Sequence, residues 1–119
     1  MPTVLALGLD PSFVDLSSAG PSPDLVRAFI ASELDRLRAL GYEVVSCLVD
    51  LGDTAEAVVA QALAARRFDC VLIGAGLRSP ERLLLFEQLL NAVHRGAPDA
   101  KICFNTSPRD STEAVQRWV

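Results

Sequence analysis

Two glycines, an arginine and a serine follow a short apolar run in the second half of the chain. They are Gly74, Gly76, Arg78 and Ser79, within the segment Gly-Ala-Gly-Leu-Arg-Ser. Glycine lets a backbone approach a ligand closely, arginine carries a permanent positive charge, and a serine that begins a helix leaves amides free for an anion. The pattern predicts a site for phosphate or a similar anion. It is not the Gly-x-Gly-x-x-Gly dinucleotide fingerprint, and the glycines equally fit a tight strand-to-helix turn.

A second polar segment follows the last apolar run of the chain. It contains Asn105, Thr106, Ser107 and Arg109, which can donate hydrogen bonds and add a second positive charge. These residues are candidates for the same ligand. The same residue types also make ordinary turns and helix caps, so both interpretations stay open.

Three aspartates are candidates for acid-base or metal chemistry. Asp10 and Asp50 each follow an apolar run, and Asp15 lies in the long connection that spans residues 10–20. If they converge, they can bind a divalent cation, and Asp10 or Asp15 can serve as a general base. Loop solvation and helix capping explain the same residues, so no metal site is assigned. Gly8 stands two residues before Asp10 and joins the candidate ligand-binding residues.

Histidine and cysteine contribute little to a candidate site. His94 is the single histidine and stands just before Gly96, at the expected end of a helix remote from the polar segments. A cation there opposes the helix dipole, and no Ser-His-Asp or Cys-His set is expected. Cys47, Cys70 and Cys103 lie in apolar runs without metal-ligand spacing. They are expected to be reduced, buried packing residues.

The elements that position these residues follow from the apolar pattern. Four apolar runs, residues 4–9, 44–49, 70–73 and 101–105, lack the polar alternation of a half-exposed strand. Such runs indicate parallel strands covered on both faces. Helical periodicity between and after them gives the order β-α-β-α-β-α-β-α. With right-handed crossovers this predicts one α/β domain over residues 1–119, a flavodoxin-like or Rossmann-like three-layer open sheet with strand order 2-1-3-4.

Short motifs mark the expected helix ends. In two places serine precedes proline, and in two others aspartate stands three residues before glutamate, as in a capping box. The motifs are Ser22-Pro23, Ser79-Pro80, Asp53 with Glu56, and Asp110 with Glu113. The first helix is expected to end at Gly41.

The third expected helix carries more leucine than one buried face needs. Its predicted inner face is Leu83, Phe86, Leu90 and Val93, which leaves Leu84 and Leu85 pointing away. Exposed leucines, a free edge strand and Trp118 predict a homodimer through Leu84, Leu85 and Trp118. The alternative is that the C-terminal helix covers these residues within one chain.

Composition narrows the classes of partner. The chain has 119 residues, half of them hydrophobic, and a formal net charge of −4. This balance argues against nucleic acid or anionic lipid as a partner. No apolar run reaches the roughly 18 residues of a membrane span and no leader pattern is present, so no membrane association and a cytoplasmic location are expected.

The order and spacing of the elements resemble the receiver domain of response regulators. The resemblance lies in residues 4–11, Val-Leu-Ala-Leu-Gly-Leu-Asp-Pro, and residues 68–77, Phe-Asp-Cys-Val-Leu-Ile-Gly-Ala-Gly-Leu. It implies the flavodoxin-like fold alone, because Gly74 stands where a receiver has its phosphorylated aspartate, and Gly8 and Leu9 replace its magnesium-binding acids. The chain is also similar to small uncharacterised single-domain proteins of bacteria and fungi, through residues 8–11, 103–108 and 114–118.

Parallel α/β sheets bind ligands beyond the carboxyl ends of their strands, where the strand order reverses. Here that position lies between the first and third strands, next to the glycine and asparagine segments. We therefore expect a small domain that binds an anionic, phosphate-containing or nucleotide-like metabolite there. Two alternatives remain: a non-catalytic, dimeric interaction module, and a small hydrolase or lyase that uses loop carboxylates. The sequence leaves open whether there is catalysis and names no cofactor.

Overall fold

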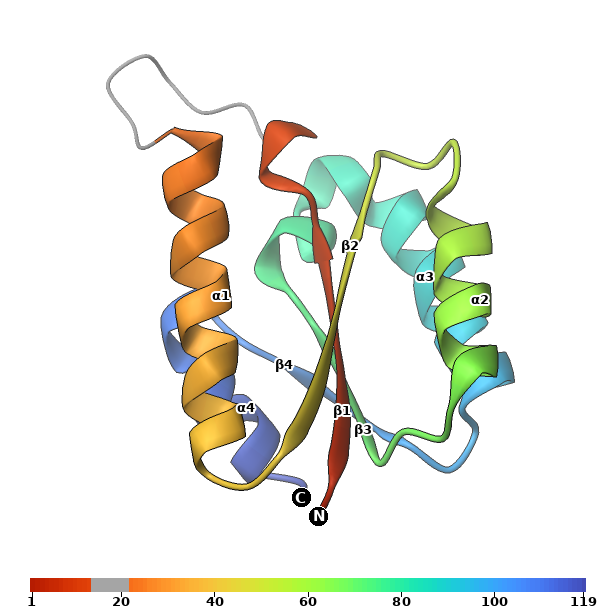
Figure 1. Ribbon diagram of the computed structural model, residues 1–119. Helices are drawn as coiled ribbons and strands as arrows, with labels where there is room; N and C mark the ends of the chain where they lie inside the picture. The colour runs from red at the N-terminus through yellow and green to blue at the C-terminus, as the bar shows by residue number, and fades with distance from the viewer. Residues whose placement is uncertain (14–21) are drawn as a thin grey trace.

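A single parallel sheet organises the chain (Figure 1). The computed structural model describes residues 1–13 and 22–119, in which four strands lie in the order β2-β1-β3-β4. The strands are β1 (Thr3–Leu9), β2 (Glu43–Val49), β3 (Cys70–Ile73) and β4 (Lys101–Phe104). The predicted strand order and the three-layer, flavodoxin-like α/β architecture are confirmed.

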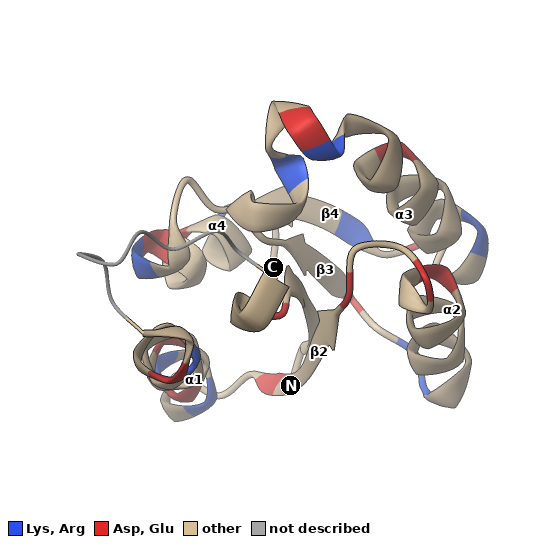
Figure 2. Cartoon of the chain, turned by 90° about the horizontal axis from the view of Figure 1, so that it is seen from above, with Lys and Arg blue, Asp and Glu red and all other residues tan. Residues whose placement is uncertain are grey.

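Helices cover both faces of the sheet, as the view from above shows (Figure 2). One layer holds α1 (Pro23–Ala39) and α4 (Ser111–Gln116), and the other holds α2 (Ala55–Ala65) and α3 (Leu83–Gly96). Short 3₁₀ helices occupy connections: η1 (Pro11–Phe13), η2 (Ala75–Arg78), η3 (Pro80–Arg82) and η4 (Pro108–Asp110). Among the described residues, no helix is long and apolar enough to cross a membrane.

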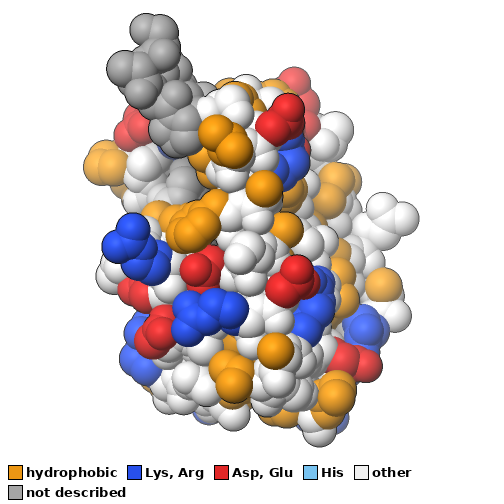
Figure 3. All heavy atoms as spheres, turned by 60° about the vertical axis from the view of Figure 1, so that its left-hand side comes forward, with side chains coloured by type: hydrophobic (Ala, Val, Ile, Leu, Met, Phe, Trp, Pro, Cys, Tyr) orange, Lys and Arg blue, Asp and Glu red, His pale blue; other side chains and the backbone are white. Residues whose placement is uncertain are grey.

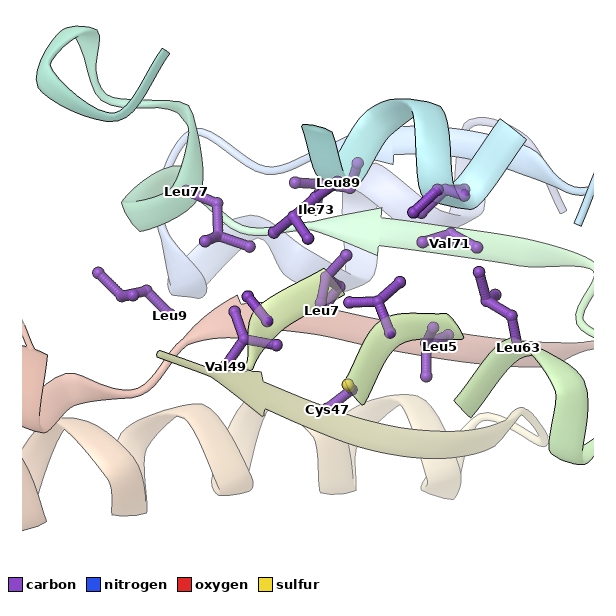
Figure 4. Close-up of a cluster of buried hydrophobic side chains, with 14 of the residues drawn as sticks. Leu5, Leu7, Leu9, Cys47, Val49, Leu63, Val71, Ile73, Leu77 and Leu89 are labelled. Atoms are coloured by element: carbon purple, nitrogen blue, oxygen red, sulfur yellow. The ribbon is translucent and has the colours of Figure 1, made fainter. Parts of the chain in front are cut away.

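The two central strands, β1 and β3, are almost entirely apolar because both of their faces pack against helices. In β1, Leu5, Leu7 and Leu9 point toward α2 and α3, where they join the larger buried cluster (Figure 4). Val4 and Ala6 alternate with them and point toward α1 and α4. Two-sided burial thus explains why the polar alternation of a half-exposed strand is missing.

Helix α1 has the ends that the sequence predicts. The Ser22 hydroxyl accepts the N–H of Leu25 at 3.2 Å, and Pro23 occupies the first helical position. Beyond the helix, Gly41 has φ +99°, a left-handed conformation that glycine adopts without steric cost. The chain therefore turns directly into β2.

The start of α3 differs from the prediction, and so does part of its inner face, although Phe86, Leu90 and Val93 pack into the core as predicted. The helix begins at Leu83 and not at Pro80, since Ser79 and the residues after it form the separate turn η3. Leu83 is 62% exposed, whereas Leu85 packs against the core and Leu89 is fully buried. The start of the helix is apolar on all sides, so its periodicity did not fix which side faces the sheet.

The two predicted capping boxes are also wrong. Helix α2 begins after Thr54, whose N–H donates to the Asp50 carboxylate at 3.0 Å, so Asp53 is not its cap. Asp110 forms a capping box with Ser107 in η4 and not with Glu113 in α4. In both places a carboxylate binds backbone amides of the preceding turn and not those of the helix, although α4 still begins directly after Asp110.

The three residues expected at a dimer surface lie in different environments. Leu84 is 77% exposed in the first turn of α3, while Leu85 is half-buried against the α2–α3 core. Trp118 is 54% exposed and follows α4, in the helical layer on the opposite face of the sheet. One continuous patch therefore does not contain all three.

Candidate functional site

A cavity lies at the carboxyl ends of the strands, between α1 and the sheet. Its volume is about 180 Å³, and it sits over β1 and β3, where the chain connections leave toward opposite faces of the sheet. This is the position at which parallel α/β sheets bind ligands. Figure 3 views the molecule from the side that carries α1, where apolar side chains are interspersed with charged ones.

The cavity exists because small residues stand where a filled sheet would carry larger ones. Ala6 and Gly8 occupy the positions of β1 that face α1, and Gly74 occupies the equivalent place after β3. Opposite them α1 presents larger apolar side chains, which do not reach the floor. The walls are almost entirely apolar and are formed by Ala6, Gly8, Leu9, Pro11, Val26, Ile30, Leu34, Ser46, Leu48, Leu72, Gly74, Ala75, Gly76, Asn105, Pro108 and Ser111.

One buried amide forms the polar corner of the cavity. Asn105 is 5% exposed, and its side-chain oxygen accepts the N–H of Ala75 at 3.1 Å and Nη2 of Arg78 at 3.1 Å. Its side-chain nitrogen donates to Oγ of Ser111 at 3.1 Å. Asn105 therefore ties η2 to α4 across the end of the sheet.

Arg78 is held inside the fold by the same network. Its Nε donates to the carbonyl of Ile73 at 3.1 Å, and Nη2 donates to the backbone carbonyl of Asn105. The guanidinium also lies 4.9 Å from the centre of the Phe104 ring. Burial lowers the pKa of Arg78 from its ordinary value, yet the group keeps its charge. An anion would have to compete with these acceptors for the guanidinium.

Gly74 and Gly76 are brought to the cavity as predicted, but not by an unusual backbone. Gly74 has φ −71°, and a Cβ there would lie 3.5 Å from the carbonyl oxygen of Leu7. A Cβ on Gly76 would lie 3.4 Å from Cβ of Leu9. The glycines thus keep η2 close to β1. The hydroxyl of Ser79 accepts a hydrogen bond from Nη1 of Arg82 at 2.7 Å, and Ser79 does not cap α3.

The segment after β4 folds mainly onto itself. The hydroxyl of Thr106 donates to Asp110 at 2.6 Å, and the N–H of Ser107 donates to the same carboxylate at 3.2 Å. The Ser107 hydroxyl accepts the N–H of Arg109 at 3.3 Å. These groups stabilise η4, whereas the Arg109 side chain is exposed beside the cavity-lining Pro108.

Asp10 and Asp50 each bind groups close to them in their own loops or on α1. The Asp10 carboxylate accepts the N–H of Ser12 and pairs with the Arg27 guanidinium at 2.6 Å. The Asp50 carboxylate accepts the N–H of Gly52 and the hydroxyl of Thr54. No group of three or more metal-ligating side chains occurs within residues 1–13 and 22–119. Asp15 lies outside the described residues.

Three aspartate carboxyls have lowered pKa values in the folded chain, so we expect the fold to lose stability in acid. The N–H of Ser12 and the guanidinium of Arg27 lower the pKa of Asp10, and the Thr54 hydroxyl lowers that of Asp50. The Thr106 hydroxyl lowers the pKa of Asp110 in the same way. A carboxyl with a lower pKa in the folded state stabilises the fold above about pH 4, and the contribution is lost as the pH falls through the folded pKa.

We therefore expect the free energy of unfolding, measured in urea, to decrease between about pH 5 and about pH 3. In Asp50→Asn the decrease should be smaller, because one of the three lowered pKa values is removed. Equal decreases in the two proteins would show that Asp50 does not contribute.

The remaining chemical candidates lie away from the cavity. His94 is exposed in the last turn of α3, near the amino ends of the strands, as predicted. The three thiols are free and buried, with Sγ of Cys70 and Cys103 3.4 Å apart. The neighbouring Cys70 and burial raise the pKa of Cys103, and burial raises that of Cys47. The raised pKa values keep the thiols of Cys47 and Cys103 protonated at neutral pH, whereas the hydrogen bond with Cys103 lowers the pKa of Cys70.

The apolar wall was not anticipated from the sequence. Ala6, Ser46 and the α1 residues Val26, Ile30 and Leu34 line the cavity, although the helical spacing of the α1 residues is also typical of ordinary core packing. The available signal was the contrast within β1, where small residues alternate with Leu5, Leu7 and Leu9. The chain matches no protein-family model, and no curated protein sequence matches it.

Proposed function

We propose that the chain is a small-molecule-binding domain whose ligand places an apolar or aromatic group in the cavity beneath α1. The observation that carries this proposal is a cavity of about 180 Å³ with apolar walls at the carboxyl ends of β1 and β3. Proteins bind small molecules in concave, mostly apolar sites with a few fixed polar groups. Asn105 and Ser111 supply those groups here.

The anionic part of the expected ligand belongs at the rim. Arg78 is engaged by the carbonyls of Ile73 and Asn105, and Arg27 pairs with Asp10. Arg109 is exposed next to the cavity wall and is the cation that a protruding phosphate or carboxylate meets most readily. The ligand class is therefore an amphipathic metabolite such as a nucleotide or an aromatic phosphate ester.

Catalysis by Asp10 has less support than binding. A general base works best when its pKa lies near the working pH. Hydrogen bonds from Ser12 and pairing with Arg27 lower the pKa of Asp10, which makes the carboxylate a weaker base. The hydrolase or lyase alternative consequently ranks below a binding domain.

Three related probes can separate the apolar and anionic parts of the proposal. We expect phenyl phosphate and benzyl alcohol to shift the amide NMR signals of Gly8, Gly74 and Gly76, and inorganic phosphate alone to leave them in place. Arg109→Ala should weaken the binding of phenyl phosphate but not that of benzyl alcohol. Lys101→Ala is the matched control, because Lys101 begins β4 at the opposite end of the sheet.

Native mass spectrometry of gently purified protein complements the probes by detecting a retained natural ligand. Shifts at the same amides with inorganic phosphate alone would show that the site recognises an anion and not an apolar group. If neither aromatic probe shifts these amides, the cavity does not accept such a group and the proposal is wrong.

A further inference from the structure

One edge of the sheet carries backbone groups that have no neighbouring strand. β2 is an edge strand, and in Figure 2 it lies in the opening between α1 and α2. The N–H of Glu43 donates to the carbonyl of Pro2, the residue before β1, and the carbonyl of Val49 accepts the N–H of Asp10, the residue after β1. Glu43 and Val49 therefore direct their backbone groups toward β1. In a strand, successive residues direct their N–H and C=O to opposite sides. The backbone groups of Val44, Ser46 and Leu48 therefore point outward.

Only part of this edge is blocked. Nη2 of Arg38 donates to the carbonyl of Val44 at 2.9 Å, which occupies the first outward acceptor. Ser46 and Leu48 keep their outward N–H and C=O groups without a protein partner in the described part of the chain. On the other edge, the outward carbonyl of Phe104 in β4 accepts Arg117 at 2.8 Å. β2 is thus the longer and more open edge.

The β2 edge also lacks the usual protection against pairing. Natural edge strands carry charges, prolines or bulges that prevent another strand from adding. Residues 44–49, Val-Val-Ser-Cys-Leu-Val, contain none of these charges or prolines, and Ser46 is exposed. Beside the edge, α2 contributes only uncharged side chains to a shallow groove, namely Val58, Gln61, Ala62 and Ala65.

Helix α1 borders the other side of the edge with a symmetric charge pattern. Arg38 reaches β2, and residues seven positions apart lie on nearly the same side of a helix. Ala31 and Asp24 therefore share this side with Arg38, and all three are exposed. Within one chain Asp24 pairs with Arg27, and Arg38 pairs with Asp35. If two α1 helices lie antiparallel with Ala31 at the centre, Asp24 of each also faces Arg38 of the other.

The centre of the charge pattern coincides with the centre of the free backbone groups. Ser46 and Leu48 flank Cys47, which lies three residues, about 10 Å, beyond Val44 along the strand. Ala31 lies seven residues, also about 10 Å, from Arg38 along α1. Because α1 and β2 run in opposite directions, counting from the Arg38–Val44 contact brings Ala31 to about the level of Cys47. A single two-fold axis can pass through both.

We infer that the chain forms a symmetric homodimer in which two β2 strands pair antiparallel and join the sheets of the two copies. Ser46 of each copy exchanges backbone hydrogen bonds with Leu48 of the other, and the two Cys47 residues face each other. The occupant is a second copy of this chain, because the free backbone groups and the α1 charges complement themselves about one axis. Since Ser46 and Leu48 also line the cavity, the second copy lies next to the cavity wall that β2 forms.

Sedimentation velocity tests the edge directly. We expect the wild-type chain to sediment as a dimer, and Ser46→Lys to sediment as a monomer with an unchanged circular dichroism spectrum. Ser46 is exposed and its backbone groups do not bond to β1, so the folded chain tolerates the lysine, although its side chain also borders the cavity. Ser46→Thr is the matched control and should stay dimeric. A wild-type monomer at all concentrations, or a Ser46→Lys dimer, would overturn the inference.

Cross-linking tests the register independently of Ser46. The three native thiols are buried, so Ala31→Cys provides one accessible thiol near the proposed axis. A short bis-maleimide should link Ala31→Cys chains into covalent dimers and leave Ser32→Cys chains, whose thiol points elsewhere on α1, as monomers. Equal linking of both variants or of neither contradicts the register. Dimer loss in Leu84→Glu with retention in Ser46→Lys would instead assign the interface to α3.

Discussion

Replacing Gly8 with valine should stabilise the fold and abolish ligand binding at the cavity. Gly8 lies in β1 and lines the cavity floor, and a Cβ there would be 3.5 Å from Cδ2 of Leu48, an ordinary contact distance. Glycine inside a strand costs about 0.5–1 kcal/mol, and each newly buried methyl group contributes about 0.8 kcal/mol. We expect Gly8→Val to raise the free energy of unfolding by about 1–2 kcal/mol, measured in urea.

The same substitution should eliminate the NMR shifts that benzyl alcohol produces in the wild type, because the new methyl groups occupy the ligand volume. Gly96→Ala is a control of opposite sign: a Cβ at Gly96 would lie 2.8 Å from Cδ1 of Leu63, so that variant should lose stability. If Gly8→Val binds benzyl alcohol as the wild type does, the ligand does not occupy the floor at β1. If it is destabilised, the space is already required by neighbouring side chains.

Gly8 costs the strand stability, and this cost indicates what the position is for. A β-branched residue would suit this strand position better, yet the sequence keeps small residues at Ala6, Gly8 and Gly74 on the face toward α1. Proteins commonly give up stability at sites where a ligand or a moving part needs room. The small residues Ala6 and Gly8 thus fit the proposed bound group, whereas Gly74 also allows η2 to lie close to β1.

The architecture could be predicted because it depends on local sequence patterns, namely apolar runs, helical periodicity and the motifs at helix ends. Four apolar runs without alternation require coverage on both faces, and alternation with helices then leaves few topologies. Ser22 and Gly41 mark the ends of α1 through chemistry that acts within a few residues. In α3 the same reasoning failed, because leucines on several sides of the helix leave its orientation to tertiary packing with α2.

The site was only partly predictable, because residue types do not specify their partners. Gly74, Gly76, Asn105 and Ser79 do lie at the expected end of the sheet, yet Arg78 makes its contacts inward with backbone carbonyls. The cavity depends on the combined volumes of side chains from β1, β2, β3 and α1. Such a sum cannot be read from any one segment, which is why the apolar wall escaped sequence reasoning.

Removing the amide of Asn105 should cause the largest loss of stability among polar substitutions at this site. In Asn105→Ala the N–H of Ala75 and the hydroxyl of Ser111 lose a partner, and Arg78 loses one of its acceptors. A buried donor left unsatisfied costs about 1–3 kcal/mol. Because Asn105 is buried and several groups lose a bond at once, we expect a decrease of about 2–3 kcal/mol in the free energy of unfolding.

Two neighbouring variants distinguish this network from a general effect of the turn. Thr106→Ala removes an exposed hydroxyl that binds Asp110, and should cost less than about 1 kcal/mol because water replaces the lost bond. Ser111→Ala leaves the Asn105 amide bound to Ala75 and Arg78, so its cost should fall between the other two. Equal losses for Asn105→Ala and Thr106→Ala would contradict a central role for the buried amide.

The effect of Asn105→Ala should also reach the ligand. Asn105 holds η2, whose residues Ala75 and Gly76 form one wall of the cavity, against the end of β4. Without that bond η2 is free to move away from β1, and the cavity loses its fixed shape. We therefore expect benzyl alcohol to bind more weakly to Asn105→Ala than to Thr106→Ala under conditions in which both remain folded. This difference would connect the polar corner to binding and not to folding alone.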